Sequence, residues 1–334
     1  MSILNTAIIG IHGIGQLHGR TMEETGRMQV RAICDANETL RGLAEEKFPA
    51  ATFYTSAAEM YRKEQLDLAA VVVPHNLHAP IAIEALEAGV HVVVEKPMAT
   101  TYADARAMIA ASRAGGKLLT VFHNRRLDGW FLAAKSAIDD GLLGNLFEIN
   151  IAINQRFTLD TWRGYKAICG GVTFDWGVHL VDYALRFAGS PVKAVSGYYY
   201  RSPESKPEAN EDHGSMRIFF ASGAIANVSV SSVGFFQPYR YHLIGDKGSL
   251  FDEWGWDEKG KLKVHTRLSG GEFVAMEVDY RRSSWKQYYD NIAAHLLDGA
   301  PLLVSAESAA ENINVLCTAE RSFQQGGLPL PLEA

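Results

Sequence analysis

Residues 6–26, TAIIGIHGIGQLHGRTMEETG, contain a short apolar strand, a glycine-rich turn and the start of a helix. This order is typical of the first βα unit of a nucleotide-binding sheet. The dinucleotide fingerprint has glycine at the first, third and sixth places after the strand, where this chain has Gly10, His12 and Gly15. The additional Gly13 lets the backbone shift so that the His12 side chain avoids the phosphates. The turn predicts a dinucleotide site, and an ordinary βα turn is the alternative.

Apolar strands and helices continue to alternate up to residue 122. Near-continuous apolar strands of this kind are typical of a parallel sheet that is covered on both faces. We therefore expect a Rossmann domain, a doubly wound parallel sheet, over residues 1–122. Its further strands are expected at 30–34, 52–54, 68–73, 90–94 and 118–122, and its further helices at 38–47, 56–62, 79–88 and 102–114.

The second half has longer, alternating strands joined by short turns. This pattern predicts a C-terminal α/β domain, residues 123–334, with a large, open, mostly antiparallel sheet. Its strands are expected at 147–155, 192–200, 214–220, 224–233, 240–244, 262–266 and 273–278. Its helices are expected at 130–140, 173–187, 285–297 and 306–324, with the last three on one face of the sheet and the last helix able to pack against the first domain.

The composition limits the classes of function. The chain has 334 residues, 47% of them hydrophobic, and a net charge of −6 without a basic stripe. These values fit a globular protein of two domains and a small-molecule partner rather than a nucleic acid or a membrane. The three cysteines, Cys34, Cys169 and Cys317, form no C-x-x-C pair, which favours a reducing compartment. The N-terminal segment has neither a cationic n-region nor a long apolar run, so a cytoplasmic location is expected.

Asp35 ends the second expected strand. An acidic residue at this place hydrogen-bonds the ribose 2′-hydroxyl and repels a 2′-phosphate, so the sequence favours NAD over NADP. A solvated turn residue or a helix cap is the alternative for Asp35. Arg41 could meet a 2′-phosphate, so NADP stays possible, although an exposed helix arginine is the simpler interpretation.

Lys96 lies between Glu95 and Pro97 at the end of an apolar strand. Ligands bind at the carboxyl ends of strands in doubly wound sheets, and the proline restricts Lys96 to an extended conformation. Lys96 is therefore a candidate to hydrogen-bond a substrate hydroxyl. The alternative is a lysine that extends into solvent from a strand end and pairs with Glu95.

Asp175, His179 and Asp182 are spaced to share one face of a helix and to meet one ligand. A neutral imidazole suits the removal of a hydroxyl proton as hydride leaves carbon, so His179 is the expected base. Asp175 would orient the substrate or balance the charge of Lys96. Capping, pairing or binding a structural water is the alternative role. Further ligands are missing from the pattern, so no metal site is expected.

Three segments together resemble the glucose-fructose oxidoreductase/inositol dehydrogenase/MocA (Gfo/Idh/MocA) family. They are IIGIHGIG at 8–15, PHNLHAPIAIEALEAGVHVVVEKPMA at 74–99 and GGVTFDWGVHLVDYALRFAG at 170–189, in the order and approximate spacing of that family. The resemblance implies a nucleotide-binding domain followed by an open-sheet domain. It also implies NAD(P)-dependent oxidation or reduction of sugars and cyclitols, and homodimers or homotetramers, here expected to form through the C-terminal sheet.

The resemblance also implies roles for residues. Lys96 resembles the lysine of the family's EKP motif, whose lysine–proline bond is often cis, and Asp175 and His179 resemble its paired aspartate and histidine. His78 resembles a position near the nicotinamide, and packing at a helix N-terminus is the alternative. The expected cofactor-binding residues are Gly10, His12, Gly13, Ile14, Gly15, Asp35, Pro74, His78, Glu95 and Lys96.

Polar and aromatic side chains before the Gly170–Gly171 pair suit a sugar, which needs donors, acceptors and an apolar face. The expected substrate-binding residues are Arg126, Trp162, Arg163, Tyr165, Asp175 and His179. The alternative is that Trp162 is a core residue and Arg163 belongs to a surface pair. Two other functions stay open: a glycosidase or lyase that keeps its NAD bound and uses transient redox chemistry, with Tyr165 as a candidate base, and a nucleotide sensor without turnover.

Overall fold

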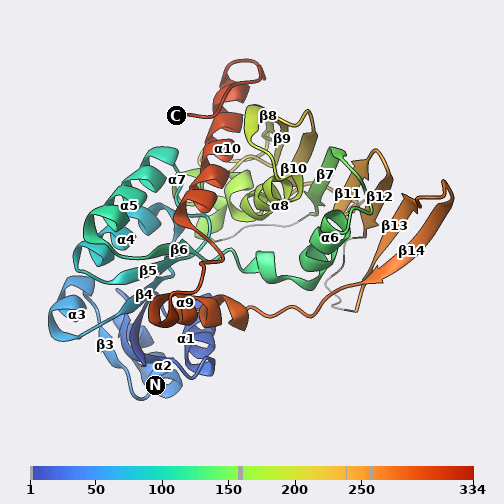
Figure 1. The fold of residues 1–334 in the computed structure, drawn as a ribbon. Coiled ribbons are helices and arrows are strands. Elements are labelled where there is room, and N and C mark those ends of the chain that lie inside the picture. Colours follow the sequence, from blue (N-terminus) through green and yellow to red (C-terminus); the bar gives the residue numbers. More distant parts are fainter. Residues whose placement is uncertain (1–2, 157–160, 238, 254, 256–258) are drawn as a thin grey trace. The chain divides into compact units, whose positions relative to one another are not determined.

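The computed structural model describes residues 3–156, 161–237, 239–253, 255 and 259–334 (Figure 1). The chain forms two compact units. The first contains residues 1–124 and 284–310, and the second contains residues 125–283 and 311–334. The chain thus enters the second unit two residues after the expected boundary at 122, but residues 284–310 belong to the first unit.

The first unit is built on a parallel sheet of six strands in the order β3-β2-β1-β4-β5-β6. The doubly wound parallel sheet expected from the sequence is confirmed. All four residues of β4 are buried, because helices cover both faces of the sheet. The strands are β1 (Leu4–Ile9), β2 (Met28–Cys34), β3 (Thr52–Tyr54), β4 (Leu68–Val71), β5 (His91–Val94) and β6 (Leu119–Val121).

The helices of the first unit have local signals at their ends. The side chains of Ser56 and Thr101 accept hydrogen bonds from the backbone N–H groups of Glu59 and Asp104, which caps two of the helices. Gly116 ends the second of these in the left-handed conformation. The helices are α1 (Ile14–Glu24), α2 (Arg41–Lys47), α3 (Ala57–Lys63), α4 (His78–Glu87), α5 (Tyr102–Gly115) and α9 (Lys286–Asp298).

Helix α9 packs against α1, so the expectation that it covers the C-terminal sheet was wrong. Tyr288 and Tyr289 are buried on its inner side, and the ring of Tyr288 meets the edge of Phe122 at a centroid distance of 4.9 Å. The hydroxyl of Tyr288 also hydrogen-bonds Thr120 on β6. The apolar face of α9 therefore completes the core of the first unit.

The second unit contains an eight-stranded sheet in the order β14-β13-β12-β11-β7-β10-β9-β8. It is antiparallel except for the parallel pair β7 and β10, as the mostly antiparallel prediction requires. The short strand β12 was not predicted, because its sequence, GSLFD, does not alternate clearly between apolar and polar residues. The strands are β7 (Leu146–Asn154), β8 (Val192–Tyr200), β9 (His213–Phe220), β10 (Ile225–Ser231), β11 (Tyr241–Gly245), β12 (Gly248–Asp252), β13 (Lys261–Arg267) and β14 (Phe273–Asp279).

The main helices of the second unit are α6 (Gly129–Asp139), α7 (Lys166–Cys169), α8 (Val178–Ala188) and, from residue 311, α10 (Ala306–Gln324). Helix α8 packs on β7 and β10. Helix α10 passes so close to β8 that a Cβ atom on Gly197 would lie 2.1 Å from the carbonyl oxygen of Ala319. The first residues of α10 belong to the first unit, and the rest of the helix belongs to the second.

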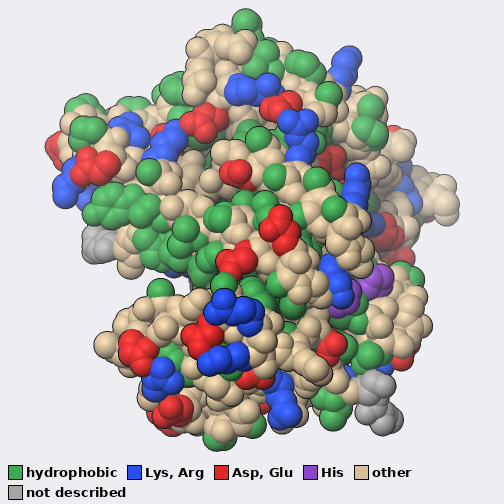
Figure 2. Space-filling view, turned by 90° about the vertical axis from the view of Figure 1, so that its left-hand side faces the viewer, with side chains coloured by type: hydrophobic (Ala, Val, Ile, Leu, Met, Phe, Trp, Pro, Cys, Tyr) green, Lys and Arg blue, Asp and Glu red, His purple; other side chains and the backbone are tan. Residues whose placement is uncertain are grey.

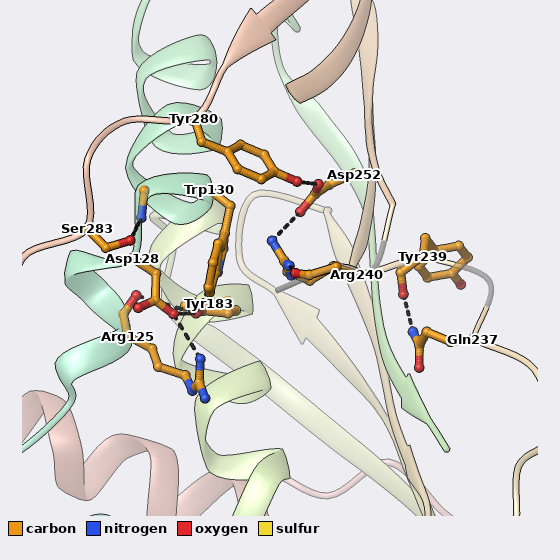
Figure 3. Close-up of polar contacts among 12 residues, drawn as sticks. Arg125, Asp128, Trp130, Tyr183, Gln237, Tyr239, Arg240, Asp252, Tyr280 and Ser283 are labelled. Carbon is orange, nitrogen blue, oxygen red and sulfur yellow. Dashed lines mark hydrogen bonds and ion pairs between the residues drawn. The ribbon is translucent and has the colours of Figure 1, made fainter. Parts of the chain in front are cut away.

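A buried polar cluster joins β12 and α6 to the residues just before β11 and just after β14 (Figure 3). The guanidinium of Arg240 donates to Asp252 at 2.9 Å and lies over the ring of Trp130, and Tyr280 donates to the same carboxylate. Arg240 and Asp252 are 2% and 0% exposed. Their charges are thus compensated within the core, as buried ion pairs require.

Charges of both signs are interspersed on the face shown in Figure 2, where Lys and Arg side chains lie among those of Asp and Glu. Within the described ranges, no helix has the length and the apolar character needed to cross a membrane. Cys34, Cys169 and Cys317 form no disulfide bond.

Candidate functional site

The glycine-rich turn between β1 and α1 has the shape that a pyrophosphate needs. A Cβ atom on Gly10 would lie 2.0 Å from the carbonyl oxygen of Val72, and one on Gly15 would lie 2.0 Å from the carbonyl oxygen of Gly10. Side chains are therefore excluded at both positions. Gly13 has a φ of 59° and precedes α1, whose N-terminus has no side-chain cap among the described residues. Its first N–H groups therefore suit an anion.

His12 does not disturb this turn. Its side chain is exposed, and none of the described residues other than glycine has a positive φ. The left-handed conformation falls on Gly13 instead. Ile14 is the first residue of α1 and is 38% exposed, so it also borders the turn.

Asp35 follows β2 and fixes the same turn. Its Oδ2 accepts a hydrogen bond from the N–H of Ile11 at 3.1 Å, and its Oδ1 accepts one from the N–H of Asn37. Arg41 is paired with Glu38, and its guanidinium lies over the ring of Phe53. The turn residues and Asp35 thus fit the pyrophosphate and ribose of a dinucleotide.

Lys96 follows β5, and the Lys96–Pro97 peptide bond is cis, as the resemblance implied. His78 begins α4 and is completely buried. Its ring nitrogens lie 2.7 Å from the carbonyl oxygen of Pro97 and 2.9 Å from that of Val73. Burial outweighs these two hydrogen bonds and lowers the pKa of His78. The structure thus favours the packing alternative for His78, and Pro74 lies one turn before it, ahead of the 3₁₀ turn His75–Leu77.

Glu95 is buried rather than open to a nucleotide, with 7% exposure. Its carboxylate accepts hydrogen bonds from His18 at 3.0 Å and from the N–H of Lys96 at 2.9 Å. Burial opposes ionisation, but the hydrogen bond from His18 and the nearby charge of Lys96 outweigh it, so the pKa of Glu95 is lowered. His18 was missed from the sequence, although its position between Gly15 and Met22 on the buried stripe of α1 was a signal.

In the second unit, Asp175 lies in a π-helical turn, Thr173–Gly177, and His179 is the second residue of α8. The predicted continuous α-helix was therefore wrong in its first turn. π-Turns of this kind often occur at functional sites. The ring of Trp176 meets that of His179 at a centroid distance of 6.0 Å, and the guanidinium of Arg125 lies over Trp176.

Asp182 is held by protein partners. It is 2% exposed, and its carboxylate accepts hydrogen bonds from Arg126 at 2.6 and 2.8 Å and from Asn312 at 3.0 Å. These contacts support the pairing alternative for Asp182, and the sequence pattern alone could not show these partners. Arg126 is held by this pair, and its contact with a substrate stays a prediction.

The segment before the π-turn brings several expected substrate residues near Asp175. Arg163 lies 3.6 Å from Asp175, and its guanidinium lies over the ring of Trp162. Trp162 is half-buried and Tyr165 is 44% exposed, so neither is a core residue. Lys166 pairs with Glu211 at 2.6 Å and with Glu320. Partial burial lowers the pKa of Lys166, but these two hydrogen bonds raise it above its ordinary value.

The fold and these groups define a class of protein, the two-unit oxidoreductases with a Rossmann nucleotide-binding sheet. Residues 4–123 match the family model described as "Oxidoreductase family, NAD-binding Rossmann fold", and residues 131–251 match the GFO/IDH/MocA C-terminal domain. The chain belongs to the Gfo/Idh/MocA family and is an NAD(P)-binding oxidoreductase.

Three relatives span most of the chain. The chain is 30% identical to 1-carboxy-3-chloro-3,4-dihydroxycyclo hexa-1,5-diene dehydrogenase of Comamonas testosteroni, over 96% of this chain and 84% of that one. It is 27% identical to scyllo-inositol 2-dehydrogenase (NADP(+)) IolW of Bacillus subtilis, over 96% of this chain and 94% of that one. The solved structure of the putative oxidoreductase yvaA from Bacillus subtilis has a TM-score of 0.89, 24% identity and 99% coverage of both chains.

Proposed function

We propose that this protein transfers a hydride between NAD and a hydroxyl or carbonyl group of a sugar, an inositol or a related polyol. The observation that carries the proposal is the position of Lys96, which lies partly exposed at the carboxyl end of β5 in a nucleotide-binding sheet. The relatives support the substrate class, since one is named an inositol dehydrogenase.

NAD, when bound, accepts the hydride that leaves the substrate carbon. The turn with Gly10, Gly13 and Gly15 would hold its pyrophosphate, and Asp35 would bind the ribose 2′-hydroxyl. The guanidinium of Arg41 is paired with Glu38 and is therefore not directed at a 2′-phosphate. This pairing supports NAD over NADP.

The acid–base work is assigned to Lys96, His179 and Asp175. Lys96 donates a hydrogen bond to the substrate oxygen and stabilises negative charge on it. His179 takes the hydroxyl proton, and Asp175 orients the substrate. Arg163, at 3.6 Å from Asp175, and the exposed ring of Tyr165 would contact the remaining hydroxyl groups.

The test is a panel of inositols, free aldoses and nitrophenyl glycosides with NAD or NADP, in which reduced nucleotide and released aglycone are recorded together. Reduced nucleotide formed from a free polyol supports the proposal. Lys96→Ala and His179→Ala should lower kcat/KM by about 10²- to 10⁴-fold. The controls Lys63→Ala and His265→Ala replace exposed residues on α3 and β13.

Aglycone release without reduced nucleotide would replace this proposal by the redox-assisted glycosidase. Binding of NAD without turnover of any substrate in the panel would favour the sensor.

Self-association is proposed through the open face of the C-terminal sheet. Tyr198 and Tyr200 of β8 are 54% and 44% exposed, and Phe323 meets the edge of Tyr198. Tyr198 and Phe323 line a hollow of about 630 Å³, together with Ser196, Ser215, Arg217 and Asn227 among others. Exposed aromatic side chains around a hollow suit a second copy. Tyr198→Lys should convert the oligomer to a monomer in sedimentation velocity, and a monomeric wild type would contradict the proposal.

A further inference from the structure

A chain of buried polar groups runs through the first unit and ends at Lys96. Tyr289 on α9 hydrogen-bonds Nδ1 of His18 on α1, and Nε2 of His18 lies 3.0 Å from Oε1 of Glu95. The second carboxylate oxygen, Oε2, accepts from the backbone N–H of Lys96 at 2.9 Å. Tyr289 and His18 are completely buried and Glu95 is 7% exposed. Helix α9, helix α1 and the end of β5, which are distant in sequence, thus meet next to Lys96.

The hydrogen-bond partners indicate which atoms of Tyr289, His18 and Glu95 are donors and which are acceptors. Burial raises the pKa of Tyr289 well above its ordinary value, so the phenol keeps its proton and donates to Nδ1 of His18. With Nδ1 as the acceptor, Nε2 of His18 is the donor to the carboxylate of Glu95. Every donor has an acceptor in this arrangement.

Aromatic rings pack against His18, the middle member of this hydrogen-bonded row. The ring of Phe122 lies 4.3 Å from that of His18, and Tyr289 meets His18 edge to face. Hydrogen bonds are stronger in such surroundings than in water, and the loss of one member leaves its partner unsatisfied. The geometry of Glu95 is therefore set by both neighbours.

The same arrangement holds the peptide after Lys96. The carbonyl oxygen of Pro97 lies 2.7 Å from Nδ1 of His78, while the N–H of Lys96 is bound to Glu95. The Lys96–Pro97 dipeptide is thus held at both ends by buried side chains. A long side chain such as that of lysine is aimed mainly by its backbone, so these two contacts limit where its ammonium group can reach.

We propose that Glu95, oriented by His18 and Tyr289, is a positioning residue that fixes the main chain of Lys96. Helix α9 is in this way part of the Lys96 site, although it lies nearly 200 residues away in sequence. The effect on turnover rests on the proposed function, whereas the effect on the Lys96 backbone does not.

Tyr289→Phe tests the proposal, because it removes one hydroxyl and keeps the ring. Tyr288→Phe is the matched control: it removes a buried hydroxyl from the adjacent residue of α9, which bonds Thr120 instead. Both variants should lower the unfolding temperature to a similar extent. Only Tyr289→Phe should lower kcat, by about fivefold or more, with the Kd for NAD within about twofold of wild type.

A second measurement does not depend on turnover. Hydrogen–deuterium exchange of the Lys96 amide, resolved in overlapping peptic fragments, should be about fivefold faster in Tyr289→Phe and unchanged in Tyr288→Phe. Glu95→Gln keeps an acceptor for this amide but loses the charge, and should give an intermediate exchange rate.

Equal exchange in the two tyrosine variants would overturn the proposal, as would faster exchange with an unchanged kcat. If exchange responds as expected but the wild type turns over no substrate, the proposed function fails and the positioning of the Lys96 backbone stands.

Discussion

The carboxylate of Asp35 accepts a hydrogen bond from the backbone N–H of Ile11 at 3.1 Å, so the end of β2 holds the glycine-rich turn that follows β1. The residue expected to choose between NAD and NADP therefore also shapes the pyrophosphate turn. Its two oxygens have separate partners in the protein, Ile11 and Asn37.

Asp35→Ala should weaken NAD binding by about tenfold or more, because a hydrogen bond to a charged group contributes about 1.5–3 kcal/mol. The Kd for NADP should change less, since the repulsion of a 2′-phosphate is removed as well. Fluorescence titration with both nucleotides measures the ratio. An unchanged ratio of the two Kd values would contradict the role of Asp35 in nucleotide choice.

Gly10→Ala should destabilise the first unit by about 3 kcal/mol or more and abolish NAD binding, because the new Cβ atom would overlap the carbonyl oxygen of Val72. His12→Gly should leave the Kd for NAD within about twofold, since His12 is exposed and has no left-handed backbone. Calorimetric titration of both variants checks the contrast. Tighter binding by tenfold in His12→Gly would show that the substituted fingerprint position does limit the cofactor site.

Asp252→Ala should destabilise the second unit by about 3–5 kcal/mol, because it leaves the buried guanidinium of Arg240 without its carboxylate. Urea unfolding followed by tryptophan fluorescence detects this change, since Trp130 lies against Arg240 (Figure 3). Lys261→Ala, which removes an exposed ion pair on β13, is the control and should unfold at the wild-type urea concentration. A similar midpoint for both variants would contradict the structural role of the buried pair.

Stability should fall as the pH drops below about 6.5, and His91 should account for part of the slope. Burial, assisted by the charge of Lys117, lowers the pKa of His91 in the folded state below its ordinary value of 6.5, and its Nδ1 accepts from the N–H of Leu118 at 2.8 Å. The unfolded chain then binds more protons than the folded one, so acid favours unfolding. His91→Asn keeps an acceptor but does not titrate. It should match wild type at pH 8 and lose less stability at pH 5.5, and parallel curves would refute this assignment.

Most of the fold could be predicted from local patterns. The apolar runs at residues 68–73 and 90–94 indicated a buried parallel sheet, in which the observed strands are Leu68–Val71 and His91–Val94. The strand at Val192–Tyr200 and the helix at Ala306–Gln324 have the predicted bounds. β12 was missed, and so was the wider π-turn at Thr173–Gly177, because backbone hydrogen-bonding patterns of this kind leave no clear periodicity.

The sequence by itself determined the two kinds of sheet, the glycine turn and the positions of Lys96, Asp175 and His179, since these depend on residue type and short spacing. Only the tertiary structure decided that α9 returns to the first unit, that Asp182 binds Arg126 and Asn312, and that Glu95 meets His18 and Tyr289. These contacts join residues far apart in the chain. Their energies come from burial and hydrogen-bond satisfaction, which exist only once the chain has packed.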